Sequence, residues 1–429
     1  MNPINRLGGR RLNLKNRLEE PEESLPRRHR PDYWLVIIVV ILLVIGLVVI
    51  YSIGTALGLA NNVSNNFYIN RQLLAIALSV VAFLAASKIP LVWWKKYYKL
   101  IIAAATVATL IAIAMPVNPQ YPAHRWVRLG SLSFQSVELV TFAVVIWLAK
   151  FLSDRIKNKQ LSNTRKAFLP LVVALVVMGA VIAGVQSDLG SIGVILGIMT
   201  ICIFVAGMPL KKIVTVSVLI AIVGILAISL TPYRRARLES FLHPSSNCLT
   251  SGYQSCQALI AVGSGGLLGL GLGRSVQAYG YLPESANDSI FAIYSEKFGF
   301  IGDMVLIGLF VALFTRIKRI AVQAPNNFTK LLSVGILTWL SIQAVINIGA
   351  MIGLLPLKGI TLPLISYGGT SMLFVMLAIG ILFQISRYTS YVQLNRNDSG
   401  DKQKERLNDD HTDRGRLRRA YNATPSGRP

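Results

Sequence analysis

Long apolar runs without a single charge constrain the fold of this chain more than any other feature. The stretch from Trp34 to Ile50 and the stretch from Ile213 to Leu230 contain no Asp, Glu, Lys or Arg. A helix that crosses a bilayer needs about 20 mostly apolar residues. Only 14% of the residues are charged, whereas a soluble protein has about a quarter. The chain is therefore predicted to be an all-α polytopic membrane protein.

The spacing of the apolar runs predicts about ten transmembrane helices. We place them at 33–55, 70–88, 99–115, 137–152, 168–185, 190–207, 213–231, 289–314, 331–350 and 367–386. Lys and Arg gather in the N-terminal tail and in alternate connections, which the positive-inside rule assigns to the cytoplasm. Both termini are then cytoplasmic, and the large connection at 232–288, between the seventh and eighth spans, is extracytoplasmic.

Three segments are predicted along the chain. Residues 32–387 form the membrane domain, while 1–31 and 388–429 are polar tails that are predicted to be disordered. The tails act either as solvated topology anchors or as docking segments for cytoplasmic partners. The net charge of +24 comes from the tails and short connections. Because no face interleaves aromatic and basic residues, no nucleic acid partner is predicted.

Two outer connections break the positive-inside pattern. Segment 116–135 carries Arg125, and the 232–288 loop carries Arg237. Structureless loops longer than about 15 residues are uncommon unless they are functional. Cationic side chains on the outer face suit an anionic, phosphate-bearing substrate. The alternative is ordinary snorkelling of arginine at the membrane interface.

A glycine-rich run between Gly263 and Gly273 lies in the same loop. It does not match a nucleotide fingerprint, because no strand precedes it and the spacing differs. The glycines instead favour close helix packing or a re-entrant backbone that lines a cavity.

The chain has three cysteines. Cys202 lies in an apolar span and is predicted to be a small core residue. Cys248 and Cys256 lie close together in the outer loop, where a disulfide is permitted. The sequence leaves open whether they form one. Metal binding is not predicted there, since His243 is the only nearby side chain of the usual ligand type.

Several carboxylates lie at membrane depth, where an ionised group usually faces a cavity or a partner. Glu138 and Asp188 lie at span ends, and Glu296 and Asp303 are two helical turns apart, which predicts one shared face. Alternatively, Glu296 and Asp303 form structural ion pairs with Lys297 or with arginines. Asp288 differs because it lies at the outer rim beside the cationic loop. A carboxylate there can accept a proton from a substrate hydroxyl. The alternative role for Asp288 is a helix N-cap.

Longer motifs resemble those of the SEDS family (shape, elongation, division and sporulation). Residues 347–371 read NIGAMIGLLPLKGITLPLISYGGTS. Further matches are Gly252–Gln254, Leu259–Gly266, Tyr281–Glu284, Asp288–Ile293, Arg125–Trp126, Gln135 with Glu138, and Gln186–Gly190. The resemblance runs from about residue 32 to 388 in one order. The KGITLP segment at 358–363 is closer to division-type than to elongation-type members.

This resemblance implies a peptidoglycan glycosyltransferase of the plasma membrane that polymerises lipid II at the outer face during cell division. It implies Asp288 as the general base of an inverting transfer. The substrate-binding residues that it implies are Glu138, Arg125, Arg237, Lys358, Ser366 and Tyr367. No cofactor is expected, because the lipid diphosphate already activates the sugar, and a divalent cation is left open. The implied partners are a class B penicillin-binding protein and other division proteins at the septum.

The sequence departs from the family pattern near the implied site. Ser136 and Val137 replace the usual proline and serine, Thr141 replaces a lysine, and Ala286 replaces a histidine. Losing the lysine removes a cation near the expected diphosphate path. A non-catalytic role, either lipid II translocation or scaffolding of the division machinery, is the alternative function. The outer position of the candidate charges favours the enzyme.

Overall fold

Helices of membrane-spanning length dominate the structure, which is a computed structural model. It describes residues 27–28, 30–60, 62–64, 66–115, 126–129, 132–215, 217–218, 239, 241–242, 248–250 and 252–389. The α-helices are α1 Tyr33–Ala60, α2 Phe67–Lys88, α3 Leu91–Lys96, α4 Tyr98–Ala114, α5 Ser136–Lys157, α6 Leu169–Met178, α7 Leu189–Val205, α10 Tyr253–Ser264, α11 Ile290–Val322, α12 Asn327–Met351 and α13 Gly369–Ile385. The π-helices Thr164–Phe168 and Gly179–Val185 flank α6 and continue it in both directions.

The positions of the helices follow the apolar runs. Each predicted span corresponds to a helix, except 213–231, most of which lies outside the described residues. Within the described part, six helical segments are long and apolar enough to cross a membrane, and α4, α7 and α13 are shorter apolar helices. The helical, membrane-spanning architecture is therefore confirmed, while the total of ten spans stays a prediction.

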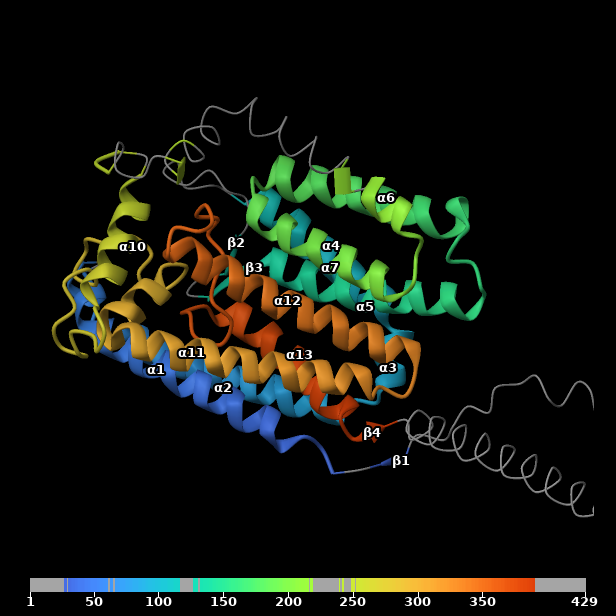
Figure 1. Cartoon of the computed structure of the whole chain (residues 1–429), viewed down its shortest axis with the longest axis horizontal. Helices are drawn as coiled ribbons and strands as arrows, with labels where there is room; N and C mark the ends of the chain where they lie inside the picture. Colours follow the sequence, from blue (N-terminus) through green and yellow to red (C-terminus); the bar gives the residue numbers. More distant parts are fainter. Residues whose placement is uncertain are drawn as a thin grey trace, which may run out of the picture. The chain divides into compact units, whose positions relative to one another are not determined.

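The membrane domain is a set of helices that run side by side (Figure 1). Helices α5, α12 and α13 are its most buried members, and α12 packs against α5, α7 and α11. Helix α13 lies along α2, where Gly380 allows a close approach. A Cβ atom at Gly380 would lie only 2.6 Å from the carbonyl oxygen of Phe83.

We call the end at which α2, α5, α7, α11 and α13 begin the outer end, following the predicted orientation. The segment 352–368, between α12 and α13, starts at this end and re-enters the domain. Its residues Leu364 and Ile365 contact Gly46 near the middle of α1, where a Cβ atom would lie 2.7 Å from the Ile365 oxygen. Irregular backbone at this depth is tolerated where protein buries it, and residues 362–366 are buried. The re-entrant segment thus extends from the outer end to the middle of α1.

Two short antiparallel strand pairs depart from the all-α expectation. Strands β2 Trp126–Leu129 and β3 Leu132–Gln135 pair directly before α5, with Trp126 opposite Gln135. In the tails, β1 Arg27–Arg28 pairs with β4 Tyr388–Thr389. The remainder of both tails, and with it the prediction of disorder, lies outside the described residues.

Candidate functional site

The segment that carries Asp288 is held at the outer end through its main chain. Three consecutive carbonyl oxygens, at residues 286–288, each accept a hydrogen bond from the α12–α13 region. The first accepts from the Tyr367 amide at 2.8 Å, the second from Ser366 Oγ at 2.6 Å, and the third from Asn347 Nδ2 at 2.7 Å. Ser366 Oγ also accepts from the Leu362 amide at 2.8 Å. The main chain of residues 286–288 is therefore held by three hydrogen bonds from the α12–α13 region.

Asp288 is half-buried and lies two residues before Ile290, the first residue of α11. The N-cap position of α11 is Ser289, and no side chain caps the helix there. The N-cap interpretation of Asp288 is therefore wrong, because Asp288 lies one residue before the cap. The Oγ atom of Ser289 instead accepts a hydrogen bond from Gln254 Nε2 at 3.1 Å.

Asn347 connects the Asp288 segment to the re-entrant segment. Its Nδ2 group donates both to the Asp288 oxygen and to the Ile360 oxygen, each at 2.7 Å. Its side chain is 2% exposed, so water cannot readily replace these bonds. Asn347 therefore sets the distance between the two segments.

Replacing Asn347 with leucine should let the Asp288 segment shift. A shift of about 1 Å at a reacting group can slow a reaction by about 10²-fold, so we expect the kcat of the implied glycosyl transfer to fall by up to that factor, with a smaller effect on KM. Single-turnover kinetics on the folded variant would measure the effect. Gln384→Leu is the matched control, since Gln384 is a buried amide on the inner half of α13. Equal rates for both variants would remove the positioning role.

A polar cavity adjoins Asn347 on the side of α5. It is lined by Gln135, Glu138, Thr141, Ser191, Val194, Gln343, Gly359, Ile360 and Thr361. The carboxylate of Glu138 faces the side chains of Ser371 and Gln343. One oxygen of Glu138 and the Oε1 atom of Gln343 are buried without a hydrogen-bond partner among the described groups. The cavity therefore offers acceptors that a polar ligand or water can satisfy.

Two further carboxylates, Asp188 and Glu296, accept hydrogen bonds from neighbouring segments. Asp188 caps α7 by accepting from the Ser191 amide at 3.0 Å and from Ser191 Oγ at 2.9 Å. Glu296 binds the glycine-rich loop, because it accepts from the amides of Val276 and Gln277 at 2.8 and 3.1 Å and from the hydroxyl of Ser275. The Asp188 contact holds Ser191, which lines the cavity, and the Glu296 contacts hold the glycine-rich loop.

The expectation that Glu296 and Asp303 share one helical face is wrong. Helix α11 is broken between them at Gly299, whose φ of 64° and ψ of −170° are not helical. The glycine-rich loop fills the break: Phe300 donates to the Gly266 oxygen at 2.9 Å, and the Gly271 amide donates to the Lys297 oxygen at 3.0 Å. Of the two alternatives for the glycine run, close packing against a helix is observed, because a Cβ atom on Gly265 or Gly269 would lie 2.1 Å from a main-chain oxygen of α11.

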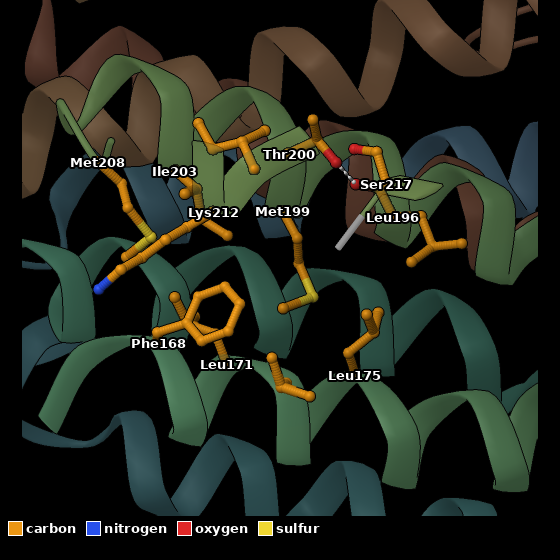
Figure 2. A pocket seen from close by; sticks show the side chains of 12 residues that line it. Phe168, Leu171, Leu175, Leu196, Met199, Thr200, Ile203, Met208, Lys212 and Ser217 are labelled. Carbon is orange, nitrogen blue, oxygen red and sulfur yellow. Dashed lines mark hydrogen bonds between the residues drawn. The ribbon is translucent and has the colours of Figure 1, made fainter. Parts of the chain in front are cut away.

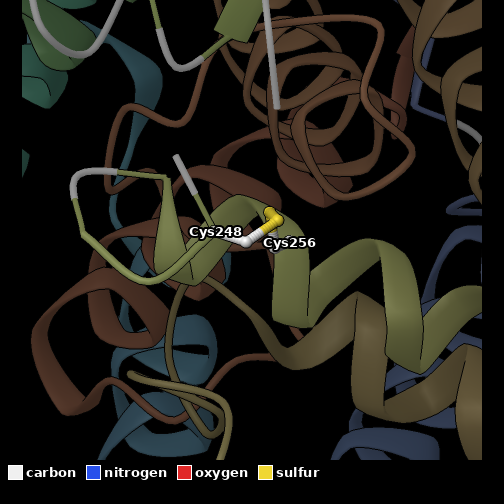
Figure 3. The surroundings of a disulfide bond; sticks show 2 residues. All are labelled: Cys248 and Cys256. Carbon is white, nitrogen blue, oxygen red and sulfur yellow. A yellow bond between two sulfur atoms is a disulfide. The ribbon is translucent and has the colours of Figure 1, made fainter. Parts of the chain in front are cut away.

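Cys248 and Cys256 form a disulfide at the start of α10 (Figure 3), which resolves the pairing that the sequence left open. Cys202 is buried, as expected. The bond ties the chain before α10 to the helix that packs on α11. It therefore limits how far the part of the large outer loop around Cys248 can move from α10.

Replacing both Cys248 and Cys256 with serine should destabilise this region by about 2–3 kcal/mol, the entropy expected for so short a closed loop. The sequence separation is 8 residues. Limited proteolysis of the outer loop would report the change, and reduction of the wild-type protein should reproduce it. Identical cleavage rates before and after reduction would show that other contacts hold the loop.

An apolar pocket at the inner end is distinct from these groups (Figure 2). It lies between the Thr164–Val185 segment and α7, and its lining includes Phe168, Leu171, Leu175, Leu196, Met199, Ile203 and Met208. Lys212 at its edge donates to the Ser162 oxygen at 2.6 Å and to Thr164 Oγ1 at 3.0 Å. The described residues that line this pocket include no carboxylate.

The structure brings together some of the predicted substrate-binding residues. Ser366 and Tyr367 hold the Asp288 segment, and Glu138 lines the adjacent cavity. Lys358 packs against the start of α7, where a Cβ atom on Gly190 would lie 2.8 Å from the Lys358 oxygen. Arg125 and Arg237 lie outside the described residues. Sequence reasoning missed Arg71, a cation near the outer end of α2.

Comparison with known proteins assigns the family. The family described as "Cell cycle protein" (FtsW, RodA and SpoVE) matches residues 33–391. The chain belongs to the FtsW/RodA/SpoVE family. It is 38% identical over 367 residues to "Stage V sporulation protein E" of Bacillus subtilis, covering 85% of this chain and 99% of the relative. It is 37% identical over 363 residues to "Probable peptidoglycan glycosyltransferase FtsW" of Coxiella burnetii, covering 83% and 96%.

Solved structures that are 24% identical to this chain share its fold. One is a chain from a study described as "Structural coordination of polymerization and crosslinking by a peptidoglycan synthase complex", with a TM-score of 0.69, 24% identity, and coverage of 83% of this chain and 98% of that one. Another is the rod shape determining protein RodA of Thermus thermophilus, with a TM-score of 0.60, 24% identity, and coverage of 84% and 98%. The similarity extends over nearly the whole of each neighbour.

Proposed function

We propose that this chain is a peptidoglycan glycosyltransferase that polymerises lipid II, with Asp288 as the general base. The observation that carries the proposal is the main-chain anchoring of residues 286–288, which positions a half-buried carboxylate at the outer end. Its curated relatives named as probable peptidoglycan glycosyltransferases cover most of the chain and support the reaction class.

In the proposed reaction, Asp288 must be placed so that its carboxylate can accept one proton. Its carboxylate takes the proton from the hydroxyl of the acceptor sugar, and the freed oxygen attacks the anomeric carbon of the donor. The bond from that carbon to the diphosphate oxygen breaks, and its electron pair leaves with the polyprenyl diphosphate. Attack from the side opposite the leaving group inverts the anomeric centre. Main-chain anchoring holds the proposed base at a fixed position for this proton transfer.

The cavity around Glu138 supplies hydrogen-bonding groups next to the proposed base. Ile360 belongs both to the lining of this cavity and to the pair of carbonyls bridged by Asn347. Polar groups bound by Glu138, Gln343 and Thr361 would therefore be linked to the main chain of Asp288 through Ile360 and Asn347. Thr141, where the family has lysine, keeps the cavity without that cation, and its hydroxyl donates to the Val137 oxygen at 2.9 Å.

The proposed partner and location follow from the proposed function. The proposed partner is a class B penicillin-binding protein, which would cross-link the strands that this chain makes, together with other division proteins. The proposed location is the plasma membrane at the division septum. A resident cofactor is not needed for the proposed transfer.

Polymerisation of labelled lipid II by the purified chain, co-purified with its transpeptidase, tests the proposal. Glycan strands that grow with time and release polyprenyl diphosphate are expected. The same preparation with Asp288→Asn controls for a contaminating polymerase. Lipid II movement across vesicles without any strand formation, from a folded complex, would support translocation and refute the transferase. Repeating the assay with a chelator tests the need for a divalent cation.

A further inference from the structure

The polar cavity that Glu138 lines collects oxygen atoms from several elements. Its oxygen-bearing side chains include Glu138 and Thr141 of α5, Ser191 of α7, Gln343 of α12, and Thr361 of the re-entrant segment. We call this space the Glu138 cavity. It encloses about 10 Å³, which is room for about one water-sized sphere. The enclosed part of the cavity therefore suits one water or one small ion.

The hydroxyl groups of α5 and α7 in the Glu138 cavity already donate their protons elsewhere. Thr141 Oγ1 donates to the Val137 oxygen at 2.9 Å, and Ser191 Oγ donates to Asp188 Oδ2 at 2.9 Å. A hydroxyl group has one proton and two lone pairs. Toward any further group, both hydroxyl oxygens can therefore act only as acceptors or as metal ligands.

Two more acceptors of the cavity are deeply buried. Glu138 is 7% exposed and Gln343 is 6% exposed. Oε2 of Glu138 and Oε1 of Gln343 have no hydrogen-bond partner among the described groups. Within the part of the chain that the structure describes, Glu138 also forms no ion pair with a lysine or arginine. Because a buried carboxylate without a counter-charge is costly, the cavity is suited to a positive charge.

The surroundings of Glu138 favour its ionised form and a cation beside it. Glu138 lies in the first turn of α5, where no side chain caps the helix, and a negative charge is stabilised at that end of a helix. Asp188 acts electrostatically on Glu138 and adds to the negative potential. The two oxygens of Asp188 already accept from Ser191, so Glu138 is the carboxylate left for a ligand.

We propose that the Glu138 cavity binds one monovalent metal cation, Na⁺ or K⁺, with Glu138 as its charged ligand. Thr141, Ser191 and Gln343 supply neutral oxygen ligands, which hard cations prefer. One carboxylate balances one positive charge. The enclosed volume also leaves little room for the several waters that Mg²⁺ usually keeps. The bound ion would join α5, α7 and α12 to one another. The inference is independent of the proposed function, because binding of the ion needs no lipid II.

Two simpler occupants of the cavity make different predictions. A proton on Glu138 would neutralise the carboxylate, and a water molecule would donate to two of the acceptors. A ligand that binds only the folded state stabilises it in proportion to its concentration and affinity. Neither a proton nor water would therefore make stability depend on which monovalent cation is present at constant pH and ionic strength.

The experiment measures binding of radiolabelled Na⁺ to the purified full-length protein in detergent, with choline chloride holding the ionic strength constant. The wild type should bind one ion per chain, and unlabelled Na⁺ or K⁺ should displace it. Glu138→Gln should weaken binding by about 10- to 100-fold, the range for a lost interaction with a charged group. Asp154→Asn is the matched control, because Asp154 pairs with Lys150 at the inner end of α5, and its affinity should equal that of the wild type.

Thr141→Lys provides a second measurement. Residues 138 and 141 are neighbours on the surface of a helix, so the new ammonium group should lie beside the Glu138 carboxylate and take the place of the ion. The thermal midpoint of the wild type should rise with Na⁺ concentration and then saturate. The midpoint of Thr141→Lys should be independent of Na⁺, and the variant should bind none.

The remaining outcomes are decisive. No saturable Na⁺ or K⁺ binding by the wild type, or equal binding by wild type and folded Glu138→Gln, would overturn the proposal. Displacement of Na⁺ by micromolar Mg²⁺ or Ca²⁺ would refute the monovalent assignment. If Glu138→Gln does not fold, Thr141→Val removes one ligand oxygen and keeps the shape, and unchanged affinity there would remove Thr141 from the site. A wild type that binds Na⁺ without making glycan strands would refute the proposed function alone.

Discussion

Asparagine in place of Asp288 is expected to lower kcat for lipid II polymerisation by about 10²–10⁴-fold, the usual contribution of a general base. Asparagine keeps the size of the side chain and the main-chain carbonyl that accepts from Asn347. The anchoring of residues 286–288 should therefore persist, and the thermal midpoint should stay within a few degrees of wild type. Strand formation under single-turnover conditions would measure the rate.

Glu284→Gln is the informative control for Asp288. Glu284 is an exposed carboxylate in the same loop, and its side chain accepts from Asn287 Nδ2. If Asp288 is the base, Glu284→Gln should retain most of the rate. A full rate in Asp288→Asn with a collapse in Glu284→Gln would move the role of base to Glu284. Loss in neither variant would point to a base outside this loop.

The helices of this protein were predictable because each is encoded by neighbouring residues. A run of uncharged apolar residues such as 34–50 has one stable outcome in a membrane, a helix whose backbone groups pair internally. The position of Asp288 just before a predicted span followed from the same pattern. The hairpin at 126–135 was missed, because its short strands lie next to a predicted span and carry no long alternating pattern.

Contacts between distant segments left no such local signal. The spacing of Glu296 and Asp303 indicated one helical face only if α11 were continuous, and the break at Gly299 depends on a loop some 30 residues earlier in the chain. Arg71 was missed for a related reason. It lies at the start of the predicted second span, where a single cation is typical of a span boundary. Its contact with Tyr367, in a segment nearly 300 residues later, has no signal in the sequence near Arg71.

The second large effect is expected at Gly269, where the glycine-rich loop meets α11. A Cβ atom there would lie 2.1 Å from the Lys297 oxygen, and the φ of Gly269 is +81°. Alanine would thus combine an unfavourable left-handed backbone with an overlap against main-chain atoms. We expect Gly269→Ala to destabilise the protein by about 2–5 kcal/mol and to lower activity, because this loop leads into the Asp288 segment.

Gly271→Ala separates the two causes. Gly271 has a similar φ of +87°, but a Cβ atom there would meet nothing within 4 Å. Its cost should be the conformational one alone, about 1–2 kcal/mol. Thermal unfolding in detergent, followed by the fluorescence of a dye that labels exposed cysteine, would compare the two variants. Equal midpoints would mean that α11 moves aside from the loop at little cost. A large difference would instead establish that the break at Gly299 and the loop that fills it form one rigid unit beneath Asp288.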